Sequence, residues 1–566
     1  MAKNTEDLPW WKKTVVYQIY PRSYMDSTGN GIGDLKGIIS KLDYIKDLGV
    51  ETIWFSPFYP SPTDKPYKEH DCGYDISNYR DINPEYGTME IFDELSEGIH
   101  SRGMKIMLDM VMNHTSIEHP WFKESRSSRD NPKRDWYIWR DGKKPNGKKP
   151  PTNWRAISGR SWEYDPLTEQ WYYHGFLPIQ PDLNYRNPEV QAEMLDTVRF
   201  WLKKGVDGYR LDMFQALFVD DEFRDAPLSR HIVSDDLDIL FRSSKRTYHH
   251  PDTFEFAKKL RATIDEFPDK YLVGEIMASY ETLKKYLGEI TEDGTDNNGL
   301  NLVFLFQSTT AGMKAKTFRK LIKDYEGWYP YPYIPTWVFG NHDQPRRISR
   351  MGNSIEKAKL NAALELTVRG VPFIYYGEEI GMQSVFIPKN ESRDAISYAF
   401  GWVPQFLRNF IKRFGLLMNR DECRTPMQWS SSANAGFSPA GVETWLPVHQ
   451  DFQKCNVEVE EKDPDSLLHC YQRFLKVRKE TPALNAGSIT LLDLEKSPKS
   501  LLAYERRGLT KGEEQIIHVF LNFSKKMVTF TNPTSNVQLL VSTTIQSNPV
   551  EGNNIILNPW EGIVLK

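Results

Sequence analysis

The sequence lacks the features that mark secreted, membrane-spanning and disulfide-rich proteins. Its first residues carry no apolar segment like that of a secretory signal, and no uninterrupted apolar run is long enough to span a bilayer. It has only four cysteines, which are scattered and form neither a CxxC pair nor a disulfide framework. We therefore expect a protein of the reduced, cytoplasmic compartment, with no membrane partner.

The chain also has no large excess of positive or negative charge. The formal net charge of the 566 residues is −4, which gives no bias towards polyanions, so we expect no nucleic acid partner. Aromatic residues are plentiful, at 13% with 16 Trp and 28 Tyr. Flat aromatic rings suit sugars, but they also fill large cores, and both interpretations stay open.

Strand-like and helix-like patterns alternate along most of the chain, which is typical of right-handed βαβ units in a parallel sheet. Eight strands are predicted, near residues 15–20, 51–55, 105–109, 205–213, 270–275, 300–306, 336–340 and 371–376. The number favours an α/β fold with a closed (β/α)8 TIM barrel. The alternative is an open doubly wound sheet, but no GxGxxG follows a strand, and polar groups end several different strands.

Two stretches interrupt this rhythm. Residues 113–182 are predicted to be an insertion after the third strand, and residues 381–430 a long loop that contains a basic amphipathic stretch at 406–414. We favour a short helix over the barrel mouth for that stretch rather than a membrane-surface segment. Residues 1–112 and 183–485 then form the barrel, and the short alternating runs of 486–566 predict an antiparallel β-sandwich domain.

The stretch Gly205–Met213 combines a helix end with a strand that carries two charges. A helix is predicted from Asn187-Pro188, a cap residue followed by proline, and Gly205 ends it. Arg210 and Asp212 are two residues apart, so their side chains lie on the same side of the strand. An arginine there keeps an aspartate ionised, as a carboxylate nucleophile requires, although an ordinary salt bridge has the same pattern.

Carboxylates follow three of the predicted strands. They are Asp212, Glu275 and Asp343, with further polar residues in Asp109–His114 and at His342. A metal centre is the competing explanation, but no HExxH occurs and the spacing fits neither a metalloprotease nor a facial triad. The pattern therefore favours a mechanism with two carboxylates and no catalytic cofactor.

These residues carry a resemblance. The runs Asp109–His114, Gly208–Asp212, Gly274-Glu275 and 341–343 resemble the four sequence regions of the alpha-amylase family of glycoside hydrolases. Further stretches are similar to its alpha-glucosidase and oligo-1,6-glucosidase branch, namely 180–184, 342–346, 377–382 and 424–429. The resemblance covers nearly the whole chain. It implies a (β/α)8 barrel, a B domain inserted after strand three and a C-terminal β domain.

The resemblance also implies roles. Asp212 is the nucleophile that forms a covalent glucosyl-enzyme, Glu275 is the general acid and base, and Asp343 favours the distorted transition state. Asp71 and Arg420 close the end of a pocket for one terminal sugar, so the action is expected to be exo. The implied substrate-binding residues are Asp71, Tyr74, His114, Arg210, His342 and Arg420. Tyr74 is expected to stack on the sugar, His114 and His342 to bind its hydroxyls, and Arg424 to be a structural neighbour.

The loop from Asp26 to Asp34 resembles the calcium or magnesium loop of the family. Its alternate positions supply the implied ligands Asp26, Thr28, Asn30, Ile32 and Asp34. Thr28 and Asn30 replace the Asn and Asp of the family pattern, which leaves two carboxylates. The resemblance implies one structural Ca²⁺ or Mg²⁺ in this loop, although the loss of two family ligands weakens that expectation.

Substrate choice stays open at this stage. Val after the nucleophile goes with α-1,6 linkages in the family and smaller residues with α-1,4, but this chain has Met213. We expect an exo-acting alpha-glucosidase on short oligosaccharides or disaccharides, as monomer or homodimer. The alternatives are an oligo-1,6-glucosidase, a hydrolase of sucrose or trehalose, and a transglucosidase or isomerase. From another class, a non-catalytic transporter subunit would need a membrane anchor.

Overall fold

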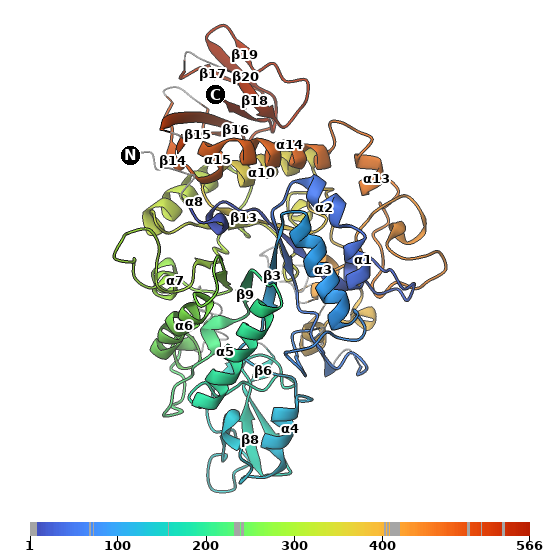
Figure 1. Ribbon diagram of the computed structural model, residues 1–566, viewed down its shortest axis with the longest axis vertical. Helices are drawn as coiled ribbons and strands as arrows, with labels where there is room; N and C mark the ends of the chain where they lie inside the picture. Colours follow the sequence, from blue (N-terminus) through green and yellow to red (C-terminus); the bar gives the residue numbers. More distant parts are fainter. Residues whose placement is uncertain are drawn as a thin grey trace.

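The computed structural model describes residues 8–66, 69–71, 73–156, 158–230, 238, 243–400, 403–404, 407, 419–494, 498–510, 512–534 and 538–566. Apart from Leu407, the helix predicted at 406–414 lies outside these residues. Figure 1 shows three regions along the long axis: a strand-containing insertion at one end, a barrel in the middle and a β domain at the other end.

Eight parallel strands form the barrel, in the order β11-β10-β9-β3-β2-β1-β13-β12. They are β1 (Val16–Ile19), β2 (Thr52–Phe55), β3 (Lys105–Met110), β9 (Gly208–Leu211), β10 (Tyr271–Gly274), β11 (Leu302–Val303), β12 (Thr336–Val338) and β13 (Val371–Tyr375). Each lies within one of the eight predicted strands or extends one residue beyond it. The predicted (β/α)8 architecture is confirmed.

Side chains, rather than a backbone ladder, join β11 to β12 and close the barrel. The Thr336 hydroxyl accepts a hydrogen bond from the Leu305 amide at 3.0 Å and donates to the Val303 carbonyl at 2.9 Å. The Ser308 hydroxyl accepts from the Val338 amide at 3.2 Å. The Thr309 hydroxyl donates to the Val338 carbonyl at 2.7 Å, so three hydroxyl groups join the two terminal strands of the ring.

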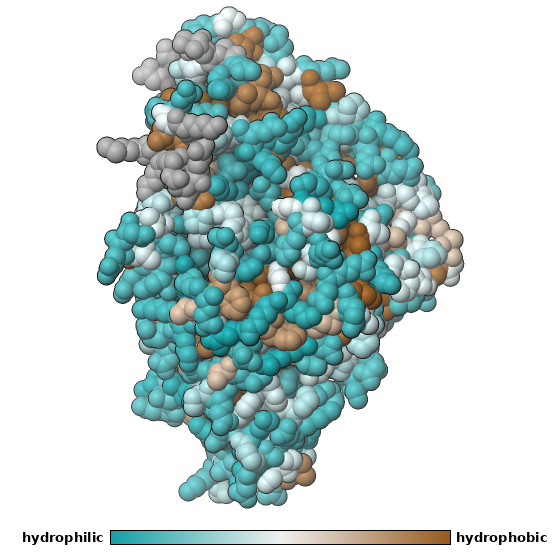
Figure 2. Space-filling model, in the orientation of Figure 1, coloured by the Kyte–Doolittle hydropathy of each residue, from teal (hydrophilic) through white to brown (hydrophobic). Residues whose placement is uncertain are grey.

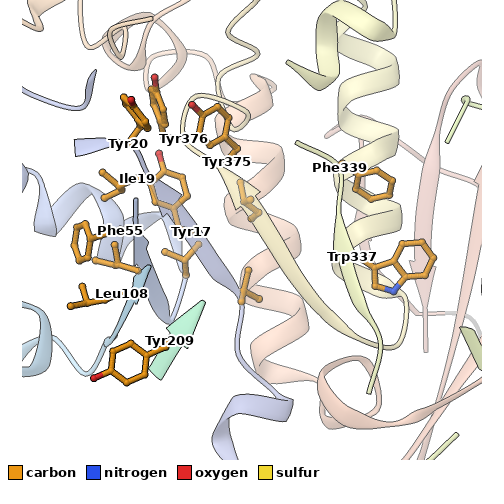
Figure 3. Close-up of a cluster of buried hydrophobic side chains, with 14 of the residues drawn as sticks. Tyr17, Ile19, Tyr20, Phe55, Leu108, Tyr209, Trp337, Phe339, Tyr375 and Tyr376 are labelled. Atoms are coloured by element: carbon orange, nitrogen blue, oxygen red, sulfur yellow. The ribbon is translucent and has the colours of Figure 1, made fainter. Parts of the chain in front are cut away.

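Strand alternation separates two apolar layers, as the period of two requires. The inward side chains form the barrel core, which includes Val16, Trp54, Met107, Val273, Val338 and Phe373. The outward side chains belong to the large core beneath the helices, and Figure 3 shows Tyr17, Ile19, Phe55, Leu108, Tyr209, Trp337 and Phe339 among them. At the carboxyl ends of the strands, the side chains that point inward are polar.

Helices surround the strands. They include α1 (Leu35–Ile39), α2 (Leu42–Leu48), α3 (Met89–Ser101), α5 (Pro188–Lys203), α6 (Pro251–Ile264), α7 (Tyr280–Leu287), α8 (Ala315–Trp328), α9 (Arg347–Arg350) and α10 (Ile355–Thr367). As predicted, the Asn187 side chain caps α5 by accepting from the Glu189 amide. The helical spacing over 35–48 splits into two helices, because Ser40 ends α1 and its hydroxyl binds the Gly37 carbonyl.

The insertion after β3 contains α4 (Pro120–Ser127) and a sheet of β4 (Trp139–Arg140), β8 (Gln170–Tyr173) and β7 (Trp162–Asp165). It also has a hairpin of β5 (Arg155–Ala156) and β6 (Gly159–Arg160). The isolated bridge between His114 and Asp182 joins its first and last parts. This bridge brings the end of the insertion next to the loop after β3.

The C-terminal region is an antiparallel sandwich, as predicted. After α14 (Leu467–Glu480) and α15 (Pro482–Ala486), one sheet has β14 (Ser488–Leu491), β15 (Leu501–Thr510), β16 (Glu513–Asn522), β21 (Gly562–Leu565) and β18 (Leu539–Ser542). The other has β17 (Val528–Thr531), β20 (Asn554–Leu557) and β19 (Val550–Glu551). A compact apolar cluster that includes Phe520, Phe530 and Ile555 draws on both sheets.

The face of the molecule in Figure 2 is largely hydrophilic, with apolar residues in small separate groups. Within the described ranges, no helix has the length and apolar character that crossing a membrane requires.

Candidate active site

Arg210 joins three carboxylates at the carboxyl end of the barrel. Its Nη1 atom lies 2.6 Å from Oδ1 of Asp109 and 2.7 Å from Oδ1 of Asp212, and its Nη2 atom lies 2.6 Å from Oε2 of Glu275. The carboxylates follow or belong to the neighbouring strands β3, β9 and β10, and the ladder places Asp109 directly beside Arg210. Two of the three predicted catalytic acids therefore share one buried guanidinium.

Burial dominates the electrostatics of this group, because it penalises the ionised form of a carboxyl. It raises the pKa of Glu275 to about 8, although Arg210 opposes the shift. It raises the pKa of Asp212 to about 7, again against Arg210. The amide of Met213 also donates to Oε2 of Glu275 at 3.2 Å. Glu275 therefore holds its proton to a higher pH than Asp212, as the acid of an acid–nucleophile pair must.

Asp343, the third predicted acid, is the most accessible, with a side chain 29% exposed. Arg424 Nη2 lies 2.9 Å and Arg420 Nη1 lies 3.5 Å from its Oδ1 atom, and His342 Nε2 lies 3.1 Å from Oδ2. Burial opposes ionisation, but His342, Arg424 and Arg420 hold the pKa of Asp343 well below its usual range. Because burial keeps His342 neutral, the two guanidinium groups supply the positive charge.

His342 belongs to a chain of hydrogen bonds. Gln18 donates to its Nδ1 atom at 2.8 Å, which places the ring proton on Nε2, 2.6 Å from the Tyr74 hydroxyl. Tyr74 in turn donates to Oδ2 of Asp109 at 3.0 Å. The rings of Tyr74 and His342 are parallel, with centroids 5.3 Å apart. The predicted stacking residue is thus held by two other members of the site.

The ring of His114 is held by two protein groups. Its Nε2 atom donates to the backbone carbonyl of Tyr74 at 3.0 Å, and the Asn113 amide donates to Nδ1. Burial lowers its pKa to about 4, so the ring is neutral near pH 7. In this structure His114 fixes Tyr74, and its contact with a sugar stays a prediction.

The predicted pair of Asp71 and Arg420 is also brought together, although 349 residues separate them in sequence. Arg420 Nη2 is bonded to Asp71 and lies 2.6 Å from Oδ1 of Asp394. Gln180 donates to Oδ2 of Asp71 at 3.2 Å. The sequence interpretation missed Asp394, because it lies inside the long loop and follows no strand.

Arg424, expected to be a structural neighbour of the site, contacts Asp343 directly, and its Nε atom donates to the His342 carbonyl at 2.8 Å. The arginine reaches the site because the 3-10 helix η8 (Arg420–Cys423) ends immediately before it. Its position in the motif 424–429 was the sequence feature that could have indicated this contact.

The loop from Asp26 to Asp34 is held together by its own amides. Both oxygens of Asp26 accept hydrogen bonds from backbone amides, at 2.7 Å from Gly29 and 2.8 Å from Gly31. Both oxygens of Asp34 are used as well, by Ser27 and by the Gly37 amide that it caps. A hard cation takes six to eight oxygens. The carboxylates as arranged fit it poorly, and the cation stays a prediction.

The sequence and the fold are similar to those of known proteins. The family model described as alpha amylase, catalytic domain, matches residues 18–487. The chain belongs to the alpha-amylase family. It is 40% identical to an oligo-1,6-glucosidase of Parageobacillus thermoglucosidasius, over 98% of this chain and 99% of the relative. It is 37% identical to an alpha-glucosidase of Candida albicans, over 98% of each chain.

Solved structures of this family superpose on nearly the whole chain. The alpha-glucosyl transfer enzyme XgtA has a TM-score of 0.86 at 34% identity and covers 99% of both chains. The trehalulose synthase MutB from Pseudomonas mesoacidophila has a TM-score of 0.85 at 34% identity, again over 99% of both chains. The alpha-amylase family therefore accounts for the insertion and the C-terminal sandwich as well as for the barrel.

Proposed function

We propose that this protein is a retaining, exo-acting alpha-glucosidase, which releases terminal alpha-linked glucose from short oligosaccharides or disaccharides. One observation carries the proposal: Arg210 holds Asp212 and Glu275 at the same time, at the ends of adjacent barrel strands. A retaining glycosidase needs two neighbouring carboxyl groups, one as nucleophile and one as proton donor. Burial raises the pKa of Glu275 to about 8, so it keeps its proton near neutral pH, as a proton donor requires.

In the proposed reaction, a carboxylate oxygen of Asp212 attacks the anomeric carbon while Glu275 gives its proton to the leaving oxygen. The glycosidic bond breaks, and a covalent glucosyl-enzyme forms. Glu275, now ionised, takes a proton from water, whose oxygen attacks the anomeric carbon and releases Asp212. Asp343 is ionised and accessible, so it favours the positive charge of the transition state.

Exo action is inferred from the ion-paired group of Asp71, Arg420 and Asp394. Arg420 lies 3.5 Å from Asp343, so this group adjoins the third acid. Its charges are buried and satisfy one another, and we propose that it blocks a longer chain beyond the terminal glucose. One sugar would then occupy the site on that side of the cleaved bond.

The test is to follow maltose, isomaltose, sucrose and trehalose by proton NMR, with wild-type protein and Asp212→Asn. We expect at least one substrate to give early alpha-glucose in excess of what its own reducing-end glucose contributes, and the variant to be inactive. Early beta-glucose in excess of that contribution, most directly read from sucrose, or an active variant would contradict the proposal. The set of substrates cleaved also reports the linkage that Met213 allows.

A second candidate function is transfer of the glucosyl group to another sugar, which the similarity to XgtA and MutB favours. The same covalent intermediate serves both reactions, and the acceptor decides the outcome. New disaccharides in the same spectra would identify transfer, and a protein without catalysis would leave all four substrates intact. The intracellular location and the monomeric or dimeric state stay predictions.

A further inference from the structure

A cavity of about 350 Å³ lies at the amino ends of the barrel strands, opposite the carboxylate site. Its wall includes Glu51, just before β2, Lys105, the first residue of β3, and residues of α14 and α15. Lys105 and Asp109 are four residues apart on or beside the same strand, which separates the cavity from the candidate active site by about 13 Å. The cavity is therefore a second location.

Three lysines line the cavity with one acid. They are Lys13, Lys105 and Lys479, and the acid is Glu51. Lys479 lies 3.7 Å from Glu51, and Lys105 lies 3.6 Å from Asp207, which accepts shorter bonds from two other side chains. Both distances exceed those of a hydrogen bond. An anion in the cavity would offer these two ammonium groups a closer partner and would reduce the repulsion among like charges.

The remaining wall suits a small sugar. Trp10 contributes an indole ring, fixed by a hydrogen bond from Nε1 to the Asp269 carbonyl at 2.9 Å, and Asn485 contributes a side-chain amide. The Lys105 ammonium lies 5.5 Å from the indole centre, so an anion held by Lys105 would lie beside the ring. The volume is near the lower end of that of small-molecule sites. These features favour a monosaccharide over a nucleotide.

We propose that this cavity binds a phosphorylated monosaccharide, with its phosphate on Lys105 and Lys479 and its sugar against Trp10 and Asn485. Lys479 belongs to α14 and Lys105 to β3. The ligand would therefore link the helix that precedes the C-terminal sandwich to the floor of the barrel. This binding is independent of the proposed glucosidase activity.

Isothermal titration calorimetry at constant ionic strength tests the proposal, with glucose 6-phosphate, inorganic phosphate and glucose as separate probes. We expect glucose 6-phosphate to bind most tightly. Its dissociation constant should rise at least about tenfold in Lys105→Gln and in Lys479→Gln, because each loses a charged hydrogen bond. Lys320→Gln is the matched control, since Lys320 is exposed on α8 and pairs with Asp324. Circular dichroism verifies that each variant is folded.

Three results would overturn all or part of the proposal. No binding of glucose 6-phosphate to the wild-type protein, or equal binding by the lysine variants and the control, overturns the site. If inorganic phosphate binds as tightly as glucose 6-phosphate, the proposed contact with the sugar is overturned. Equal affinity for glucose, unchanged in both cavity variants, assigns the binding to the candidate active site and also overturns the proposal.

Discussion

Arg424 donates a hydrogen bond from Nη2 to Oδ1 of Asp343 at 2.9 Å. Its Nε atom donates to the His342 carbonyl at 2.8 Å, so one planar side chain fixes both the third acid and the backbone beside it. The planar guanidinium can make both contacts at once, because its donors point in fixed directions. The orientation of Asp343 therefore depends on a residue 81 positions away in sequence.

We expect Arg424→Lys to reduce kcat/KM by about 10- to 100-fold, because a lysine cannot make both contacts and a hydrogen bond to a charged group contributes about 1.5–3 kcal/mol. Steady-state kinetics on the best disaccharide measure the effect. Arg199→Lys, which alters an exposed pair with Glu266, is the control and should be near wild type. Equal activity in both variants would remove Arg424 from the site.

The activity should pass through a maximum between pH values of about 7 and 8. Below the pKa of Asp212, about 7, the nucleophile is protonated, and above the pKa of Glu275, about 8, the acid has lost its proton. The measurement is kcat/KM against pH. With an aryl glucoside whose leaving group needs no proton, the decrease at high pH should disappear. A decrease that persists would assign the upper pKa to another group.

We expect the ionisation of the buried Asp182 carboxyl to lower the stability of the protein as the pH rises. Burial raises the pKa of this carboxyl to about 8, against the Gly175 amide that donates to it. A carboxyl with a raised pKa stabilises the fold below its unfolded pKa, and this contribution is lost as the pH rises through the folded pKa. Between pH of about 4 and 8, Tm should therefore decrease less in Asp182→Asn than in wild type.

Asp207 is a control for that experiment, because its contribution to stability should change with pH in the opposite direction. Despite burial, hydrogen bonds from His100 and the Ile106 amide and the charge of Lys270 lower its pKa to about 2. Its contribution is present above the unfolded pKa and is lost as the pH falls towards 2. Asp207→Asn should therefore lower Tm at neutral pH. Parallel pH profiles for the two variants would contradict both assignments.

Gly208→Ala should destabilise the barrel by about 1–3 kcal/mol, the usual cost of overpacking a core. A Cβ atom at residue 208 would lie 2.4 Å from the Tyr271 ring and 2.7 Å from the Tyr271 carbonyl oxygen. Gly327→Ala is the matched control, because it lies in α8 with nothing within 4 Å of the added atom, and it should stabilise by up to about 1 kcal/mol. Denaturant unfolding measures both changes.

Local signals were sufficient for much of the fold. The cap and proline at Asn187 and Pro188 located the start of α5, and the two-residue spacing of Arg210 and Asp212 placed both side chains towards one centre. Strand alternation is a short-range property, so it can be read from neighbouring residues. The meeting of Asp212 and Glu275 was predicted because a barrel brings the carboxyl ends of its strands to one face.

Contacts between distant loops were harder to predict. Asp394 reaches Arg420 through the fold of the long loop, and no spacing rule connects it to a strand end. The bond from His114 to the Tyr74 carbonyl was not predicted either, because a backbone group carries no sequence signal. The resemblance and the spacing predicted the site residues and the pairs Arg210–Asp212 and Asp71–Arg420, whereas the contacts of Asp394 and His114 became visible only in the structure.

Hydroxyl groups close the barrel between β11 and β12. Elsewhere neighbouring strands are joined by amide–carbonyl pairs, but at this junction the hydrogen bonds run through the hydroxyls of Thr336, Ser308 and Thr309. Valine has nearly the shape of threonine without its hydrogen-bonding capacity. Valine at residue 336 would therefore remove two of the hydrogen bonds at the junction where the ring closes.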